Sequence, residues 1–202
     1  MMLIVFSGPS GCGKTTLVKR VIAESDNLAF LVSHTTRKRR DSEIDGKDYY
    51  FVTEDEFKLK IQKQDFVEWA QVHGHYYGTS FHEIEKKKNQ NGIILDVDIQ
   101  GARQIKKYEP KAQLIFIFPP EFQELKKRLF LRGDETQESI EKRLFMAKKE
   151  IQCYDEFDFV IINDRLDEAV DNLLALIGSS GRRVEVSQEK IDAILKSFSR
   201  EG

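Results

Sequence analysis

The chain is poor in cysteine and has no long apolar run, and each shortage excludes a class of protein. Its 202 residues include two cysteines, Cys12 and Cys153, so a miniprotein held together by disulfide bonds is excluded and a reducing compartment is expected. No apolar run has the length that crosses a bilayer, and residues 1–6 are too short for the core of a signal peptide. The sequence therefore predicts a soluble, cytoplasmic protein with no membrane partner.

An excess of charge of either sign is also lacking. The chain carries 32 basic and 34 acidic side chains, for a formal net charge of -2. Such a balanced surface has no general attraction for nucleic acid, so any anion site must be local and the partners we expect are small molecules. The length suffices to bury one core with an inserted subdomain, rather than two independent domains. The oligomeric state stays open.

Apolar runs followed by helical stretches indicate an α/β fold with a parallel central sheet. Residues 2–6 form a continuous apolar run, which is typical of a strand buried on both faces of a parallel sheet, and residues 15–24 then have helical spacing. Further strands, each with a helical stretch after it, are expected at residues 92–97, 113–118 and 157–162.

The stretch from residue 33 to residue 92 has a different pattern, of short aromatic strands, turn residues and one helix. That helix, expected at residues 53–64, opens with the capping-box spacing of Thr53 and Glu56. The expected short strands are residues 49–52, 66–72 and 76–77. We interpret residues 33–92 as an inserted, β-rich subdomain.

The remaining segments complete the predicted organisation. Residues 125–150 are rich in both charges, which is typical of a solvated helical hairpin, and Gly133 breaks it. Apolar residues of the tail at helical spacing indicate a helix packed on the core; they are Ile191, Ile194, Leu195 and Phe198. The predicted domains are a core at residues 1–32 and 93–181, the subdomain at 33–92, and the helical tail at 182–202.

A glycine-rich loop carries the strongest functional signal. Residues 8–15 match G-x-x-x-x-G-K-[ST] in full and lie between a buried strand and a helix, as this phosphate-binding motif requires. Backbone N–H groups and the helix N-terminus would face the phosphates of ATP, Lys14 would neutralise charge, and Thr15 could bind Mg²⁺. A glycine-rich turn with a surface lysine is the weaker alternative. The predicted ATP-binding residues here are Gly8, Pro9, Ser10, Gly11, Cys12, Gly13, Lys14, Thr15 and Thr16. Cys12 is interpreted as a small residue that fits the loop.

The expected strand at residues 92–97 runs into carboxylates, Asp96 and Asp98. Carboxylates in this place hold Mg²⁺ or its waters opposite the phosphate loop. Many strands end in aspartate, but beside a phosphate loop the pattern indicates that at least one of the two is functional. We predict Thr15 and Asp96 as Mg²⁺ ligands and leave open which aspartate lies closer to the metal.

The segment from Ser33 to Phe51 resembles the guanylate kinase signature, S-x-T-T-R-x-x-R-x-x-E-x-x-G-x-D-Y-x-F. The resemblance continues in order and covers nearly the whole chain up to about Gly178, through Glu68, Tyr77-Gly78-Thr79, Asp96-Val-Asp98, Arg132-Gly133, Arg143 and Asn163. It implies a three-layer P-loop fold with a helical lid at about residues 125–150. It also implies an ATP:GMP phosphotransferase that uses Mg²⁺.

Two arginines three residues apart, Arg37 and Arg40, offer forked donors that suit one phosphate monoester, with Tyr49 and Tyr77 adding hydroxyls. A solvated basic turn is the alternative. Glu43 and Asp48 are interpreted as turn residues outside the core site.

A guanine edge presents N1–H and an amino group as donors and O6 as an acceptor, so a carboxylate and a hydroxyl can recognise it. Glu68 and Ser33 meet those needs, although Glu68 could instead be an ordinary charge on a strand face. The resemblance implies both, together with Asp98 and Thr79. The predicted GMP-binding residues are Ser33, Arg37, Arg40, Tyr49, Glu68, Tyr77, Thr79 and Asp98.

The resemblance places a lid over the ATP phosphates near residues 132–143. Phosphoryl transfer asks the protein mainly for in-line positioning and charge neutralisation. The predicted catalytic residues are Lys14, Arg37, Arg132 and Arg143. Asn163 is predicted to contact the adenine side of ATP, with a turn or helix cap as the alternative. Arg128 is interpreted as a surface helix charge.

Other functions share parts of this sequence pattern. Guanylate-kinase-like scaffold modules bind phosphopeptides, but typically lack a working phosphate loop. A regulatory GTPase needs a late N-K-x-D element, which Asn163-Asp164 does not supply. A nucleoside monophosphate kinase of different base specificity is the closest rival.

Overall fold

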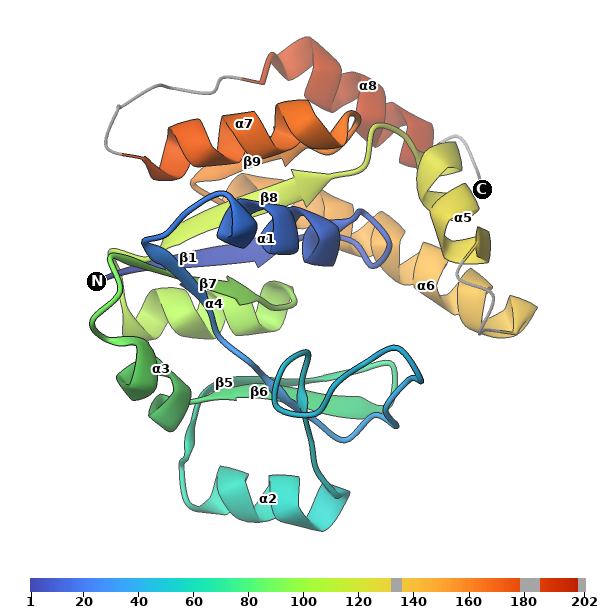
Figure 1. The fold of residues 1–202 in the computed structure, drawn as a ribbon. Helices are drawn as coiled ribbons and strands as arrows, with labels where there is room; N and C mark the ends of the chain where they lie inside the picture. Colours follow the sequence, from blue (N-terminus) through green and yellow to red (C-terminus); the bar gives the residue numbers. More distant parts are fainter. Residues whose placement is uncertain (132–135, 179–185, 200–202) are drawn as a thin grey trace. The chain divides into compact units, whose positions relative to one another are not determined.

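The computed structural model describes residues 1–131, 136–178 and 186–199 (Figure 1). The strands are β1 (Met2–Ser7), β2 (Leu28–Phe30), β3 (His34–Thr35), β4 (Tyr50–Phe51), β5 (Phe66–Val72), β6 (His75–Ser80), β7 (Gly92–Asp96), β8 (Gln113–Phe118) and β9 (Phe159–Ile162). The helices are α1 (Lys14–Ala23), α2 (Glu54–Gln62), α3 (Phe81–Lys87), α4 (Ile99–Tyr108), α5 (Phe122–Leu131), α6 (Gln137–Glu150), α7 (Leu166–Ile177) and α8 (Gln188–Ser199). A 3₁₀ helix, Ile151–Glu156, follows α6.

Five strands form the central sheet, in the order β2-β7-β1-β8-β9. β2 pairs in parallel with β7, and β8 pairs in parallel with β9. The apolar side chains of β1, β7 and β8 are buried, as expected for strands covered on both faces. The predicted α/β class with a parallel sheet is confirmed.

The chain divides into two compact units, and each is described by itself. The first comprises residues 1–5 and 26–113, and the second comprises residues 6–25 and 114–202. No helix in the described part of either unit is long and apolar enough to span a membrane.

In the first unit a second sheet has the order β4-β3-β6-β5, with β5 and β6 antiparallel. α2 packs on it through Phe57, whose ring stacks on those of Phe66 and Tyr76 at 4.5 and 5.3 Å between centroids. Thr53 caps α2 in the predicted capping box, because its side chain accepts from the Glu56 N–H while Glu56 accepts from the Thr53 N–H. The sequence placed this helix correctly.

The expectation of one helix within residues 33–92 is wrong. A second helix, α3, begins after Ser80, whose Oγ accepts a hydrogen bond from the Glu83 N–H. α3 has seven residues and buries only Glu83 and Ile84, so it lacks the broad apolar stripe by which a helix is recognised.

In the second unit the C-terminal helix packs on α5, as predicted for the tail. Ile191, Ile194 and Phe198 are buried, and the Phe198 ring meets that of Phe122 edge to face at 5.1 Å. Ser197 Oγ also accepts a hydrogen bond from the Phe122 N–H. The Leu195 side chain is only partly buried.

Candidate active site

The phosphate loop joins β1 to α1 through three glycines in the left-handed region. Gly8, Gly11 and Gly13 have φ of 141°, 94° and 96°. A Cβ on Gly8 would lie 2.4 Å from the carbonyl oxygen of Ile117 on β8, so only glycine allows the loop to leave the strand this closely. The loop therefore turns its backbone tightly in front of α1, where N–H groups can face an anion.

Lys14, the first residue of α1, folds its side chain back over the loop. Its Nζ donates hydrogen bonds to the carbonyl oxygens of Gly8 at 2.7 Å and Pro9 at 3.2 Å. These neutral acceptors hold an ammonium group at the loop, where phosphate oxygens would be stronger partners. Thr15 and Thr16 follow in the exposed first turn of the helix.

Arg143 on α6 reaches the same loop. Its Nη1 donates to Ser10 Oγ at 3.1 Å, so two of the predicted catalytic residues, Lys14 and Arg143, lie at the phosphate loop. Arg37 belongs to the first unit. Arg132 lies outside the described residues.

Asn163, at the end of β9, is tied to the loop. Its Nδ2 donates to the carbonyl oxygen of Cys12 at 2.7 Å, and the residue is 6% exposed. The helix-cap alternative is wrong, because Arg165 occupies the N-cap position of α7. Cys12 itself is fully buried, in agreement with its interpretation as a small residue that fits.

Arg128 is engaged inside the fold, so its interpretation as a surface charge is wrong. Its guanidinium donates to the carbonyl oxygens of Asn163 at 3.3 Å and Cys12 at 3.4 Å, and its Nε donates to Glu124 Oε1 at 2.9 Å. One side chain thus links α5, the phosphate loop and the turn after β9. The Glu-to-Arg spacing of four residues was visible in the sequence, but the two carbonyl partners come from distant segments.

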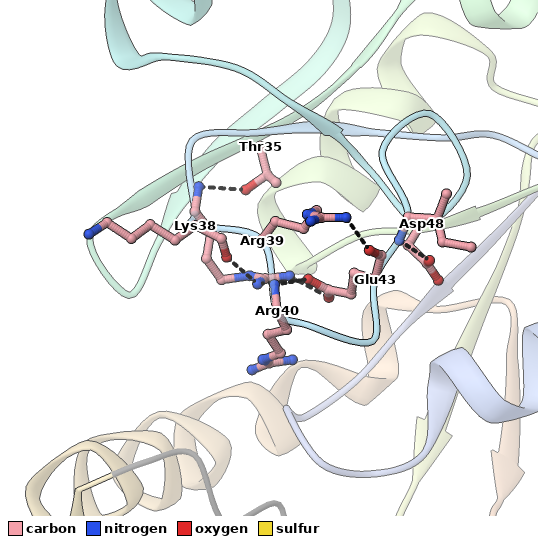
Figure 2. Close-up of polar contacts among 8 residues, drawn as sticks. Thr35, Lys38, Arg39, Arg40, Glu43 and Asp48 are labelled. Carbon is pink, nitrogen blue, oxygen red and sulfur yellow. Dashed lines mark hydrogen bonds and ion pairs between the residues drawn. The ribbon is translucent and has the colours of Figure 1, made fainter.

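In the first unit Arg37 is held by Glu43, one of the residues labelled in Figure 2. The guanidinium donates to both carboxylate oxygens, Nη2 to Oε1 at 2.7 Å and Nη1 to Oε2 at 3.1 Å, and Nη1 also donates to the Lys38 carbonyl oxygen at 2.7 Å. Burial opposes the charge of Arg37, but its hydrogen bonds to Glu43 and the charges of Tyr77 and Glu43 outweigh that effect, so the pKa of Arg37 is raised. The same pair lowers the pKa of Glu43, against the effect of its burial.

The rings of Tyr49 and Tyr77 complete the surroundings of Arg37. The centroid of the Tyr49 ring lies 5.5 Å from the Arg37 guanidinium carbon. The Tyr49 and Tyr77 rings meet edge to face, with 6.0 Å between their centroids. Burial raises the pKa of Tyr49 above its ordinary value, and the charge of Asp96 adds to that shift. The Tyr49 hydroxyl therefore stays protonated and available as a donor.

Glu43 also organises the turn that carries the second predicted arginine. Its Oε2 accepts from the backbone N–H of Arg40 at 2.9 Å, whereas the Arg40 side chain points away from Glu43 in Figure 2. The Asp48 carboxylate accepts from the Ile44 N–H at 2.9 Å, which agrees with its interpretation as a turn residue. Glu43 does more than that: it fixes Arg37 and the backbone of Arg40 together.

A second polar group in the first unit brings together predicted base-reading residues. The hydroxyls of Ser33 and Thr79 lie 2.9 Å apart and are buried. Glu68 on β5 is the register partner of Thr79 on β6, next to a β-bulge between Phe66 and Glu68. A carboxylate and two hydroxyls therefore meet on strands whose backbone positions are fixed by pairing.

Glu68 is 3% exposed, and burial raises the pKa of its carboxyl group to about 7. Hydrogen bonds from the Thr79 hydroxyl and backbone oppose this shift, and the charge of Asp98 adds to it. Asp98 caps α4, because its Oδ1 accepts from the Gly101 N–H at 2.8 Å. Two carboxyl groups are thus placed close together, one buried and one engaged by a helix N-terminus.

The predicted Mg²⁺ ligands fall in different units, Thr15 in the second and Asp96 in the first. Within the described residues there is no group of three or more histidine, cysteine, aspartate or glutamate side chains that could hold a metal by itself. The hydroxyl of Thr15 and the carboxylate of Asp96 are nonetheless the oxygen donors that Mg²⁺ prefers.

Comparison with known proteins identifies the family. The family model described as guanylate kinase matches residues 1–180. The guanylate kinase of Thermotoga maritima is 41% identical over 191 residues, which cover 94% of this chain and 92% of the relative. That of Helicobacter pylori is 46% identical over 175 residues, covering 86% and 85%. The chain belongs to the guanylate kinase family.

A solved guanylate kinase, from Anaplasma phagocytophilum, has a similar fold with a TM-score of 0.72 at 28% identity, and the match covers 91% of this chain and 87% of that one. The resemblance drawn from the sequence is therefore confirmed. In this member of the guanylate kinase family, Glu43 and Arg128 were not assigned to the site from the sequence. Glu43 is the glutamate of the signature and could have been recognised from it, whereas no nearby residue indicated the role of Arg128.

Proposed function

We propose that the protein transfers the γ-phosphoryl group of ATP to GMP, and also to dGMP, giving ADP and the nucleoside diphosphate. The observation that carries the proposal is the buried group of Glu68, Thr79 and Ser33 in the same unit as the braced Arg37. The group of Glu68, Thr79 and Ser33 suits the hydrogen-bonding edge of guanine, and Arg37 suits a phosphate monoester. Family membership supports the same substrates.

Guanine would be selected by its hydrogen-bonding edge. As a carboxylate, Glu68 accepts from the N1–H and the amino group, and the hydroxyls of Ser33 and Thr79 can donate to O6. Adenine has neither the N1–H nor the amino group at that edge, so its binding would leave these buried groups unpaired. Asp98, the fourth predicted residue of this pocket, holds its place by capping α4.

The acceptor phosphate would be bound by Arg37, Arg40, Tyr49 and Tyr77. Arg37 donates three hydrogen bonds to Glu43 and the Lys38 carbonyl oxygen, and a guanidinium has five N–H groups in all, so donors remain for phosphate oxygens. The bracing by Glu43 fixes the plane of the guanidinium in advance, which lowers the entropy lost on binding.

ATP would be bound by the loop from Gly8 to Thr16. Lys14 exchanges the carbonyls of Gly8 and Pro9 for phosphate oxygens, while Arg143 turns from Ser10 towards the γ-phosphoryl group. Asn163 would contribute from the adenine side. Thr15 and Asp96 would hold Mg²⁺, which supplies neutralisation of phosphate charge when bound.

The transfer itself needs little covalent chemistry from side chains. An oxygen of the GMP phosphate attacks the γ-phosphorus in line, and the bond to the bridging oxygen of ADP breaks. Lys14, Arg143 and Arg37 stabilise the charge that is distributed over the transferring group, with Arg132 as a further predicted clamp. We expect the enzyme to act in the cytoplasm. Its expected domains are those predicted from the sequence, namely a core at residues 1–32 and 93–181, a subdomain at 33–92 and a helical tail at 182–202.

The deciding experiment is steady-state phosphoryl transfer from ATP with a panel of acceptors, namely GMP, dGMP, AMP, UMP and dTMP. We expect kcat/KM for GMP to exceed that for AMP by orders of magnitude, because buried polar groups reject a ligand that leaves them unpaired. Faster transfer to another base would favour a kinase of different specificity. No transfer to any acceptor would instead favour a phosphopeptide-binding module.

A further inference from the structure

Gly101 occupies the first turn of α4 at the point where that helix meets Glu68. A Cβ built on Gly101 would lie 2.6 Å from Glu68 Oε2 and 3.3 Å from the carboxyl carbon. Real Cβ atoms essentially never come so close to another atom, so the present position of the carboxylate depends on the absence of a side chain at residue 101. The backbone N–H of the same glycine donates to Asp98 Oδ1 at 2.8 Å.

The helix cannot easily move to make room. Gln104, three residues later on α4, donates from Nε2 to the Trp69 carbonyl oxygen at 2.8 Å and accepts from the Trp69 N–H at 3.2 Å. This pair of hydrogen bonds fastens α4 to β5 next to Glu68. The same Cβ on Gly101 would also approach the Val97 Cβ to 3.0 Å.

The group that can yield is therefore the Glu68 carboxylate, the far end of a flexible side chain. Gly101 has helical backbone angles, and alanine is the better helix former, so the backbone itself would accept the exchange. A side chain at residue 101 should thus displace mainly the carboxylate that is proposed to bind the guanine edge, while Val97 has to shift by a few tenths of an ångström.

We propose that Gly101 is a positioning residue that sets guanine specificity by fixing where the Glu68 carboxylate lies. The inference rests on the proposed function. Gly101 acts twice, because its N–H holds Asp98 and its missing side chain leaves the space that Glu68 fills. Loss of a hydrogen bond to the displaced carboxylate is expected to weaken GMP binding by roughly tenfold to a hundredfold.

The test compares GMP with inosine monophosphate, which keeps the N1–H and lacks the amino group. Affinities of the full-length protein for both are measured by titration calorimetry, and the affinity for a non-hydrolysable ATP analogue is measured alongside. In the Gly101→Ala variant we expect GMP to bind roughly tenfold to a hundredfold more weakly, with the preference for GMP over inosine monophosphate largely lost and ATP-analogue affinity unchanged. Lys107→Ala, at an exposed position on the same helix, should change none of these.

A loss of general packing would weaken both monophosphates by the same factor, and that result would overturn the proposal. So would an unchanged preference for GMP. The wild-type protein separates the two claims, because failure of the wild type to prefer GMP would refute the proposed function itself.

A second pair of variants, Glu68→Ala with and without Gly101→Ala, removes the carboxylate that a side chain at residue 101 would contact. With Glu68→Ala the carboxylate is gone, so adding Gly101→Ala should change GMP affinity no further. If Gly101→Ala alone fails to fold, the double variant should recover the fold. A double variant that remains unfolded would mean that Gly101 serves packing against Val97, and the proposal would be wrong.

Discussion

The Arg37 guanidinium and the Glu43 carboxylate form a two-bonded ion pair, at 2.7 and 3.1 Å, with both side chains largely buried at 15% and 13% exposure. Such a pair fixes the plane of the arginine, which a lysine could not reproduce. The carboxylate also holds the backbone N–H of Arg40, so both predicted phosphate-binding arginines depend on one acid.

Glu43→Gln should therefore weaken GMP binding by about tenfold, the scale of one hydrogen bond to a charged group, without affecting ATP. Calorimetric titration of each nucleotide measures this. Glu54→Gln, in an exposed pair with Lys58 on α2, is the matched control and should leave GMP affinity at the wild-type value. An undiminished GMP affinity in Glu43→Gln would show that Arg37 needs no bracing.

Glu68→Gln should lose GMP selectivity and gain stability. The folded pKa of Glu68 is about 7 against an ordinary value of 4.5, so the folded chain binds more protons than the unfolded chain between these values. Stability is then lost as the pH rises from 4.5 through 7, by up to about 3 kcal/mol at pH 8. Glutamine at residue 68 carries no charge, so the variant does not lose folding stability in this way as the pH rises.

Urea unfolding of the nucleotide-free protein at pH 5 and pH 8 tests this. The free energy of unfolding of Glu68→Gln should exceed that of the wild type by more at pH 8 than at pH 5, while GMP affinity falls at least tenfold. Equal differences at the two pH values would mean that the carboxyl titrates normally.

Arg128→Ala should weaken ATP binding several-fold and leave GMP binding unchanged. The arginine bridges the carbonyl oxygens of Cys12 and Asn163, so its loss removes a brace of the phosphate loop worth about 1 kcal/mol per hydrogen bond. Lys127→Ala on the same helix is the control, since Lys127 is 69% exposed. If both variants bind ATP equally well, Arg128 does not position the loop.

Local patterns predicted the long elements of the fold, because buried strands such as β1 and β8 and the capped helix α2 carry their signals within a few residues. The short strand β4 was expected at residues 49–52, but β2, β3 and α3 were not predicted. β2 has three residues and β3 two, so each is defined by its partner strand, and α3 lacks an apolar stripe.

The site residues likewise differ in how well the sequence predicts them, according to how far along the chain their partners lie. The phosphate loop is contiguous and its geometry follows from its glycines, whereas the roles of Arg128 and Gly101 depend on Asn163 and Glu68, which lie more than thirty residues away in the chain. The signature around Arg37 was predictable only in part. The sequence pattern includes Glu43, but the ion pair between its carboxylate and the Arg37 guanidinium forms only in the folded turn.

Lys14→Met separates binding from catalysis at the phosphate loop. The loop backbone, shaped by Gly8, Gly11 and Gly13, continues to surround the phosphates in this variant, so the affinity for ATP should fall only modestly. The charge that Lys14 neutralises grows as the γ-phosphoryl group transfers, and an interaction made mainly in the transition state appears in the rate. Turnover should therefore drop by roughly two orders of magnitude or more, the scale for losing one preorganised charge-stabilising donor.

Single-turnover rates and separate ATP and GMP affinities, with circular dichroism to verify the fold, measure that split. Arg143→Ala should behave in the same way, because its contact with Ser10 places it at the same loop. Arg40→Ala is the contrasting variant: the GMP phosphate carries its charge before the reaction begins, so part of the loss must appear in GMP affinity. Near wild-type turnover of Lys14→Met would refute the catalytic role of the loop lysine and, with it, the assignment of phosphoryl transfer to this site.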